Sequence, residues 1–242
     1  MMQGQIIAIG GTGFSEAPAE PALERYLLAQ AGTARPRVCF IGSASGDNDG
    51  YVSRFYETFA ALDCTPSHLG LFRRTRDLRS HLLAQHLVFV GGGNTKSLIA
   101  LWRDWGLPEL LREAAAGGCV LAGTSAGAIC WFHSGITDSW GDGLHVLPTL
   151  GFLPGSCCPH YDGEAERQPY YRQAMAAGAV QPGHAMDDCV ALHFRDGVLL
   201  RAVATRTDAR AFHVSSEAGL CIERPLPVQL LGAEGTLSPP VR

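Results

Sequence analysis

The stretch CVLAGTSAGAICWF, residues 119–132, contains the change of local structure around which the rest of the chain can be organised. Its first four residues are apolar and predict a short strand that is buried on both faces. Gly123-Thr124-Ser125-Ala126-Gly127 then matches the pattern G-x-S-x-G, and an apolar, helix-compatible run follows at 128–132. A serine between a buried strand and a helix, flanked by small residues, is typical of a nucleophile elbow. We therefore predict that Ser125 is a nucleophile, rather than part of a turn without chemistry.

The segments before this stretch predict the fold class. Continuous apolar runs that are too short for amphipathic helices predict further buried strands at residues 5–9, 38–41 and 87–90. Segments with helical spacing lie between the strands, at residues 18–31, 49–62, 78–83, 97–105 and 107–116. Strands that alternate with helices predict an α/β fold with a doubly wound, mostly parallel sheet.

The second half of the chain differs from the first in composition. Residues 133–164 are rich in Gly, Asp, Ser, Pro and Cys, and we expect a long irregular region with functional residues there. A further helix is expected over 165–178. Extra antiparallel strands are expected near the C-terminus, at residues 189–194, 198–204 and 220–222. We interpret residues 1–242 as one α/β domain, with a loosely held tail over 225–242.

Length and composition exclude several classes of protein. The chain has 242 residues, of which 46% are hydrophobic and 17% charged, so it can bury a large core and is not disordered. The net charge of −4 argues against nucleic acid as a partner, and no apolar run approaches the ~18 residues of a membrane span. The start of the chain does not resemble a signal peptide. We expect a cytoplasmic protein, either a monomer or a homodimer, that does not bind a membrane.

The eight cysteines include no C-x-x-C pair and no pair with zinc-finger spacing. Several of them lie in the apolar runs that predict strands. We therefore expect buried free thiols in a reducing compartment, and neither a metal ion nor another cofactor.

Two further glycine-rich turns follow predicted strands. Gly10-Gly11-Thr12-Gly13 begins like a dinucleotide fingerprint, but Glu16 occupies the position of the third glycine, which makes nucleotide binding the weaker hypothesis. The turn Gly91-Gly92-Gly93 can present backbone N–H groups to an anion or to a developing oxyanion. A non-catalytic module that binds a small molecule through both turns is the alternative to an enzyme.

A serine nucleophile needs a base, and the chain has nine histidines. His160 is the favoured candidate because it follows a proline and precedes an acidic loop in the irregular region. Three weaker candidates are His145, His184 and His213. The remaining five are not expected to lie at the active site: His68, His81, His86, His133 and His193. For the acid that orients the base, Asp188, Asp187 and Asp138 all stay open, because catalytic triads occur in several chain orders.

The series of motifs resembles one known family. Residues 91–95 (GGGNT), 123–128 (GTSAGA), 159–161 (PHY) and 187–188 (DD) resemble, in this order and spacing, dipeptidase E and cyanophycinase, the aspartyl-dipeptidase family of serine peptidases. The resemblance covers roughly residues 7–214 and implies a flavodoxin-like sheet, similar to that of class I glutamine amidotransferases. Amidotransferase activity itself is not expected, because that chemistry uses a cysteine at the elbow and Cys130 lies five residues beyond it.

The resemblance also implies roles for individual residues. Ser125 would be the nucleophile, His160 the general base and Asp188 the acid, although the bacterial aspartyl dipeptidases have a glutamate at that position. The oxyanion hole would consist of the backbone N–H groups of Gly92 and Ala126. Arg167 would be the clamp for a substrate carboxylate, and Asn94 is a further residue expected to bind the substrate. An exopeptidase must also recognise the free α-amine, for which Asp162, Glu164 and the loop near Asp138 all stay open.

The activity implied is the hydrolysis of dipeptides through an acyl-enzyme, with a preference for N-terminal aspartate or a broader range. The second hypothesis is a cyanophycinase-like hydrolase of β-aspartyl-arginine polymer or dipeptide, which would need an acidic subsite for the arginine side chain. In both cases a small peptide is the expected partner.

Overall fold

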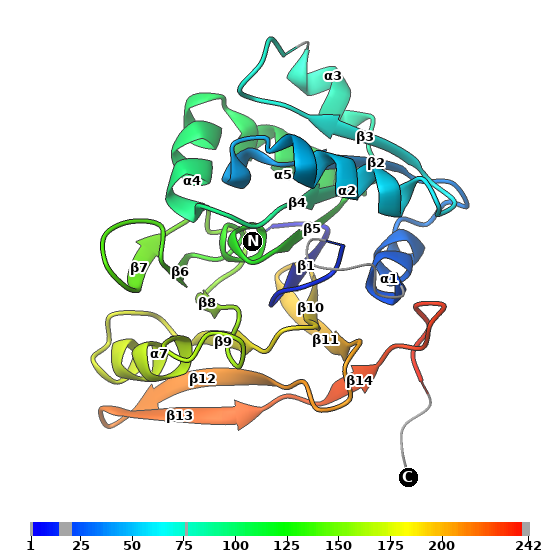
Figure 1. The fold of residues 1–242 in the computed structure, drawn as a ribbon. Coiled ribbons are helices and arrows are strands. Elements are labelled where there is room, and N and C mark those ends of the chain that lie inside the picture. The colour runs from blue at the N-terminus through cyan, green and yellow to red at the C-terminus, as the bar shows by residue number, and fades with distance from the viewer. Residues whose placement is uncertain (1, 15–20, 76, 239–242) are drawn as a thin grey trace.

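The computed structural model describes residues 2–14, 21–75 and 77–238, and its strands form two sheets (Figure 1). The larger sheet has eight strands in the order β14-β11-β10-β1-β5-β4-β2-β3. From β1 to β3 all neighbours are parallel, whereas β10 is antiparallel to both β1 and β11. The strands of this sheet are β1 (Gln5–Ile9), β2 (Arg37–Ile41), β3 (Thr65–Leu69), β4 (Leu87–Val90), β5 (Val120–Thr124), β10 (Val190–Arg195), β11 (Val198–Ala204) and β14 (Val228–Leu230).

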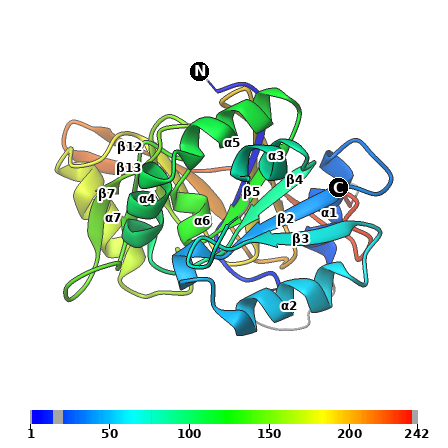
Figure 2. The same cartoon turned by 90° about the horizontal axis from the view of Figure 1, so that it is seen from above.

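Helices cover both faces of this sheet because its central strands are apolar on both faces. In β1, for example, Ile7 and Ile9 pack with α1 and α2, whereas Ile6 and Ala8 pack with the helices of the other face. Figure 2 shows α2 on one side of the strands and α3 and α5 on the other. The helices are α1 (Ala22–Gln30), α2 (Asp49–Phe59), α3 (Leu78–Leu83), α4 (Thr95–Asp104), α5 (Leu107–Ala116) and α6 (Ala126–Ile129), with a short 3₁₀ helix at Ser43–Ser45. None of the helices in the described ranges has the length and apolar character needed to cross a membrane.

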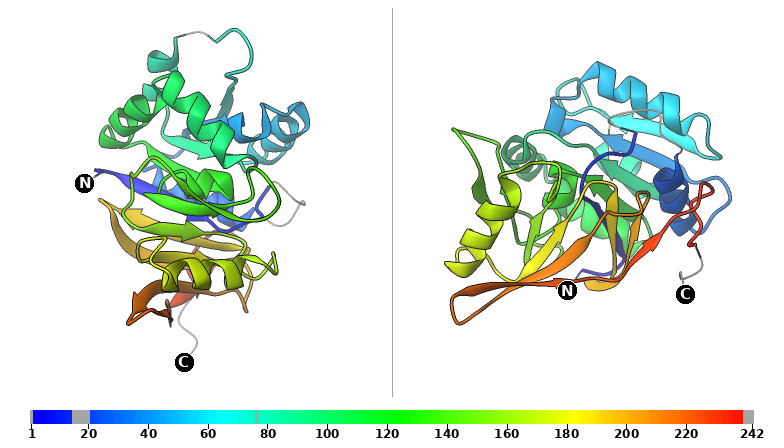
Figure 3. Two further views of the ribbon diagram at one scale, coloured as in Figure 1. Left: turned by 90° about the vertical axis from the view of Figure 1, so that its left-hand side faces the viewer. Right: turned by 60° about the horizontal axis from the view of Figure 1, so that its bottom comes forward.

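The second sheet has six strands in the order β13-β12-β9-β8-β6-β7. The helix α7 (Arg167–Ala176) packs on it (Figure 3), with Tyr171 and Met175 in one core cluster with Phe212 and Val214. The strands are β6 (Ser134–Thr137), β7 (His145–Pro148), β8 (Ser156–Cys158), β9 (Gly183–Met186), β12 (Ala211–Glu217) and β13 (Leu220–Pro225).

The predicted α/β class with a doubly wound, mostly parallel sheet is confirmed, as are the antiparallel strands β10 and β11. The expectation that residues 133–164 are irregular is wrong, because β6, β7 and β8 lie there. Each of these strands has three or four residues, which is too short for a recognisable period. The sequence also did not indicate β3, an edge strand in which Pro66 interrupts the apolar pattern.

The expectation of a loosely held tail from residue 225 is wrong for the part of the tail that the structure describes. Val228 of β14 pairs with Ala202 of β11, and the backbone of Leu231 forms a bridge with Leu237. Leu231 is also buried in the core, which anchors the segment to the sheet. Residues 239–242 lie outside the described residues, as do residues 18–20 of the helix that we predicted over 18–31.

All eight cysteines are free thiols, and six of them are buried. Burial raises the pKa of Cys119 and of Cys158 to about 12, so both thiols stay protonated at neutral pH. Cys130, close to the elbow, is completely buried, and burial raises its pKa well above the usual value. It is therefore an inert packing residue rather than a nucleophile.

Candidate active site

Ser125 lies at the junction between β5 and α6. Its backbone has φ 54° and ψ −115°, a conformation that a residue with a side chain adopts only under strain. The strain is held by the backbone on both sides: the Ser125 N–H donates to the carbonyl of Ile9 at 3.1 Å, and its carbonyl accepts from Ala128 and Ile129. A side chain held in this way at the end of a strand is the geometry of a nucleophile elbow.

The two glycines of the G-x-S-x-G pattern are required by close packing. A Cβ on Gly127 would lie 2.3 Å from the carbonyl oxygen of Val90 in β4. A Cβ on Gly123 would lie 2.3 Å from the carbonyl oxygen of Gly127 itself. The elbow can therefore turn this tightly against the sheet only because neither position carries a side chain.

His160 and Ser125 line the same pocket, which has a volume of about 240 Å³. The His160 imidazole is 13% exposed, and its Nδ1 lies 2.7 Å from Oδ1 of Asp188. With a carboxylate at Nδ1, that nitrogen carries the proton and Nε2 is left as a base. The other residues that line the pocket are Thr12, Tyr51, Arg54, Gly92, Gly93 and Thr124.

The structure brings one of the three candidate acids to His160. The side chain of Asp187, next to Asp188, is buried and its Oδ2 accepts a hydrogen bond from the backbone N–H of Arg210 at 2.9 Å. Burial raises the pKa of Asp187. The carboxylate of Asp138 is 65% exposed and lies 3.7 Å from Arg167 instead. Asp188 is thus the carboxylate in a position to orient the imidazole.

Asp162, which we expected to bind the substrate, lies behind Asp188. Its Oδ1 accepts the backbone N–H of Asp188 at 2.8 Å, and its Oδ2 pairs with Arg206. Burial alone would raise the pKa of Asp162, but these hydrogen bonds lower it. Both carboxylate oxygens are therefore used within the protein, one of them on the turn between β9 and β10 that carries Asp188, and the expected contact with substrate is not supported.

The first glycine-rich turn makes room for the pair of His160 and Asp188. A Cβ on Gly11 would lie 2.0 Å from Oδ1 of Asp188 and 2.5 Å from Nδ1 of His160. On the other side of the carboxylate, a Cβ on Gly163 would lie 2.2 Å from Oδ2. The contacts at Gly11 explain the glycine at this position of the turn without a nucleotide.

We expect Gly11→Ala to reduce kcat by about 10²-fold, because the added methyl group must displace the imidazole or the carboxylate and small misplacements of catalytic groups are costly. Steady-state kinetics and thermal unfolding of the purified variant measure activity and folding separately. Gly232→Ala is the matched control, because its Cβ would meet Thr236 Oγ1 at an ordinary 3.7 Å. A Gly11→Ala enzyme as active as this control would contradict the assignment of the pair.

The two backbone N–H groups expected to form an oxyanion hole lie beside the nucleophile. A Cβ on Gly92 would be 3.2 Å from Cβ of Ser125, and Ala126 begins α6, where the first N–H groups have no acceptor within the helix. The Gly92 N–H donates to the hydroxyl of Tyr51 at 3.3 Å. Tyr51 lines the same pocket as Ser125. Sequence reasoning did not find Tyr51.

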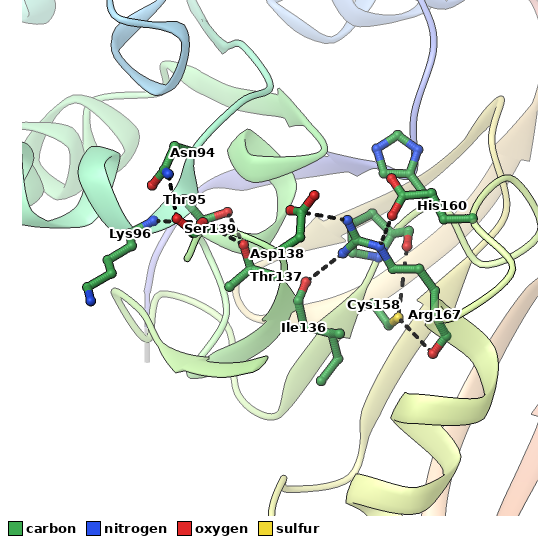
Figure 4. Close-up of polar contacts among 12 residues, drawn as sticks. Asn94, Thr95, Lys96, Ile136, Thr137, Asp138, Ser139, Cys158, His160 and Arg167 are labelled. Atoms are coloured by element: carbon green, nitrogen blue, oxygen red, sulfur yellow. Dashed lines mark hydrogen bonds and ion pairs between the residues drawn. The ribbon is translucent and has the colours of Figure 1, made fainter. Parts of the chain in front are cut away.

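Arg167, expected to clamp a substrate carboxylate, is buried in a network of its own. The side chain is 3% exposed; its Nε lies 2.6 Å from Oε2 of Glu164 and its Nη1 donates to the carbonyl of Ile136 at 2.7 Å. The third nitrogen faces Asp138 (Figure 4). A buried guanidinium needs such partners, and here they connect the start of α7 to β6. Arg167 is not among the residues that line the pocket.

Asn94, expected to contact the substrate, caps α4 instead. Its Oδ1 accepts the backbone N–H of Ser97 at 2.8 Å, and its Nδ2 donates to the carbonyl of Ser139 at 2.7 Å (Figure 4). Since the amide uses both ends in this way, it fixes the loop after β6 to the helix. The expected role in binding is not supported.

The histidines that the sequence left as weaker candidates lie away from the pocket. Burial lowers the pKa of His184 to about 4, and the ring of His213 packs on it with centroids 5.5 Å apart. His145 stacks on a neighbouring tryptophan ring. Burial also lowers the pKa of His193 to about 4, and its two nitrogens contact the hydroxyl of one side chain and the amide of another. Among the described residues that line the pocket, His160 is the one imidazole.

A second hollow, of about 340 Å³, lies beside β3 and α3. His68 and His81 line it together with Arg73 and Arg74, but it contains neither the strained serine nor the pair of His160 and Asp188. The chemistry therefore points to the smaller pocket at the strand ends, where ligands bind in doubly wound sheets.

A strained serine on a strand–helix turn, a histidine held by a carboxylate and a doubly wound sheet recur together in serine hydrolases of the α/β class. Comparison with known proteins narrows this class. The sequence model of peptidase family S51 matches residues 6–201. The chain belongs to this family and is therefore a serine peptidase.

Curated relatives support the assignment. An uncharacterized peptidase of Bacillus subtilis (strain 168), YgaJ, is 49% identical over 229 residues, which cover 94% of this chain and 99% of the relative. Peptidase E of Streptomyces coelicolor is 34% identical over 134 residues, which cover 53% of this chain and 52% of that protein.

Solved structures show the same fold at low sequence identity. The crystal structure of a peptidase from an acI-B1 actinobacterium is 17% identical, has a TM-score of 0.71 and covers 94% of this chain and 95% of that one. A putative peptidase E from Listeria monocytogenes EGD-e is also 17% identical, with a TM-score of 0.60 over 83% of this chain and 98% of that one.

Proposed function

We propose that this peptidase is a serine exopeptidase that hydrolyses dipeptides with an N-terminal aspartyl residue. One observation carries the proposal: His160, held at Nδ1 by Asp188 at 2.7 Å, faces the same pocket as the strained Ser125. The resemblance to aspartyl dipeptidases and the relative named peptidase E support the choice of substrate.

The mechanism follows from these contacts. Ser125 Oγ attacks the carbonyl carbon of the peptide bond while Nε2 of His160 accepts the hydroxyl proton. The N–H groups of Gly92 and Ala126 stabilise the oxyanion. His160 then protonates the leaving amine and the peptide C–N bond breaks. Water, deprotonated by the same imidazole, attacks the acyl carbon. The ester bond to Ser125 Oγ then breaks, His160 returns the proton to Oγ, and the N-terminal amino acid is released.

The pocket supports a small, acidic substrate. Its volume of about 240 Å³ is suited to a small substrate such as a dipeptide. Among its described lining residues there is no carboxylate, whereas Arg54 supplies a positive charge. A cyanophycinase-like activity would need an acidic subsite, so the proposal favours the aspartyl dipeptide.

A panel of dipeptides tests this function. We expect kcat/KM for Asp-Leu to exceed that for Asn-Leu, Ala-Leu and β-Asp-Arg by about tenfold or more, because a site that pairs a substrate carboxylate discriminates strongly against analogues without it. N-acetyl-Asp-Leu, which lacks the free amine, is expected to be a poor substrate of an exopeptidase. Faster hydrolysis of β-Asp-Arg, or of the acetylated peptide, would contradict the proposal.

A further inference from the structure

Arg54 is a charged residue of the pocket to which the mechanism gives no role. It projects from α2 and lines the same pocket as Ser125 and His160. Its guanidinium lies over the ring of Tyr51, with Cζ 5.4 Å from the centroid. The salt bridges among residues 2–14, 21–75 and 77–238 include none to Arg54. A cation beside the nucleophile is thus not neutralised by the described side chains.

Tyr51 fixes the position of Arg54 relative to the nucleophile. The two residues are three apart on α2 and so lie on the same face of the helix. The Tyr51 ring is buried against Phe40, with centroids 5.0 Å apart, and its hydroxyl accepts the Gly92 N–H. A guanidinium that stacks on a fixed ring loses less entropy when it binds an anion, and it stays charged at any physiological pH.

Arg167 offers a contrast with Arg54 in both exposure and partners. Arg167 is 3% exposed, and Glu164, Asp138 and a backbone carbonyl surround its guanidinium. Breaking these contacts to bind a substrate would leave buried groups unpaired. Arg54 is exposed to the pocket and would lose only water and the face of one ring.

We propose that Arg54, and not Arg167, binds a carboxylate of the substrate. The inference rests on the proposed peptidase function and deepens it by naming a residue that binds a carboxylate of the dipeptide. A planar guanidinium can donate two parallel hydrogen bonds to a carboxylate. The dipeptide offers two such groups, the side chain of its N-terminal aspartate and its C-terminal carboxylate.

Kinetics with matched substrates distinguish the two carboxylates. We expect Arg54→Gln to lower kcat/KM for Asp-Leu by about 10- to 100-fold, mainly through KM, as for the loss of a hydrogen bond to a charged group. If Arg54 binds the aspartyl side chain, the variant changes kcat/KM for Asn-Leu, which lacks that carboxylate, by less than about twofold. If Arg54 binds the C-terminal carboxylate, it is kcat/KM for Asp-leucinamide that changes by less than about twofold. Arg54→Lys is expected to recover part of the loss, since it restores the charge without the bidentate geometry.

Arg73→Gln is the matched control for charge. The substitution removes the same charge close to α2, where Arg73 pairs with the exposed Asp49 at 2.8 Å. Arg73 itself does not line the pocket that contains Ser125 and His160. We expect this variant to keep the wild-type kcat/KM for all three substrates. Arg167→Gln is expected to lower the temperature of unfolding while the preference of the folded enzyme for Asp-Leu is kept.

A binding measurement separates this inference from the proposed function. In the Ser125→Ala background, isothermal titration with Asp-Leu is expected to show about 10- to 100-fold weaker binding when Arg54→Gln is added. Unchanged binding and an unchanged substrate preference in Arg54→Gln would overturn the inference. Loss of the preference in a folded Arg167→Gln enzyme would overturn it as well. Hydrolysis by Ser125→Ala at the wild-type rate would instead overturn the function, and the binding data would still test Arg54.

Discussion

Ser125→Ala is expected to reduce kcat for Asp-Leu by about 10⁴- to 10⁶-fold, the largest effect of any single change in this chain. The variant lacks the oxygen that forms the acyl-enzyme, while the N–H groups of Gly92 and Ala126 still stabilise charge and leave a small residual rate. The strained backbone at φ 54° is the same for alanine, so the elbow should keep its shape. Steady-state kinetics measure the loss.

Two further measurements support this experiment. Thermal unfolding of Ser125→Ala should resemble that of the wild type, and Ser53→Ala, a change at an exposed serine of α2, should keep full activity. A fluorophosphonate probe should label the wild type at Ser125 and leave the variant unlabelled. If the variant hydrolyses Asp-Leu at the wild-type rate, or if the probe labels a different serine, Ser125 is not the nucleophile.

Asp188→Asn is expected to reduce kcat by about 10⁴-fold. An amide in this position can hold His160 in the wrong tautomer, with the proton on Nε2, and it removes the charge that stabilises the imidazolium. The 2.7 Å contact between Nδ1 and Oδ1 is the basis of this expectation. Because Asp188 acts through His160 and is not among the residues that line the pocket, the loss should appear in kcat rather than in KM.

Asp187→Asn is the matched control, since it makes the same chemical change one residue earlier. Asp187 accepts hydrogen bonds from Arg210 and is buried away from His160, so its variant should lose stability while kcat stays within about tenfold of the wild type. Kinetics and thermal unfolding of the two variants, side by side, distinguish the acid from its neighbour. If Asp187→Asn lost activity and Asp188→Asn kept it, the acid would be Asp187.

Much of the larger sheet could be predicted because its central strands are buried on both faces. The strands β1, β2, β4 and β5 are continuous apolar runs, and such runs between helical segments have few other interpretations. The second sheet could not be predicted in the same way. Its strands β6, β7 and β8 have three or four residues each. Although β6 and β7 form a local hairpin, β8 joins them to β9 through partners more than 20 residues apart in the chain.

The sequence also does not reveal which polar side chains form their hydrogen bonds within the protein rather than with a ligand. Arg167, Asn94 and Asp162 lie in or near the motifs of the family, but each uses its polar atoms on buried groups or on backbone ends. Residue type and spacing do not distinguish these two uses, because the difference depends on which groups are left unpaired after folding.

The sequence by itself determined the elbow at Ser125, because an apolar strand, the G-x-S-x-G pattern and a helix start are all local features of residues 119–132. Only the tertiary structure decided the rest of the site. His160 and Asp188 are 28 residues apart, and Arg54 and Tyr51 reach the pocket from a helix about 70 residues before the nucleophile. Such contacts depend on strand order and on how helices pack across the sheet. The spacing of residues along the chain predicts neither of these.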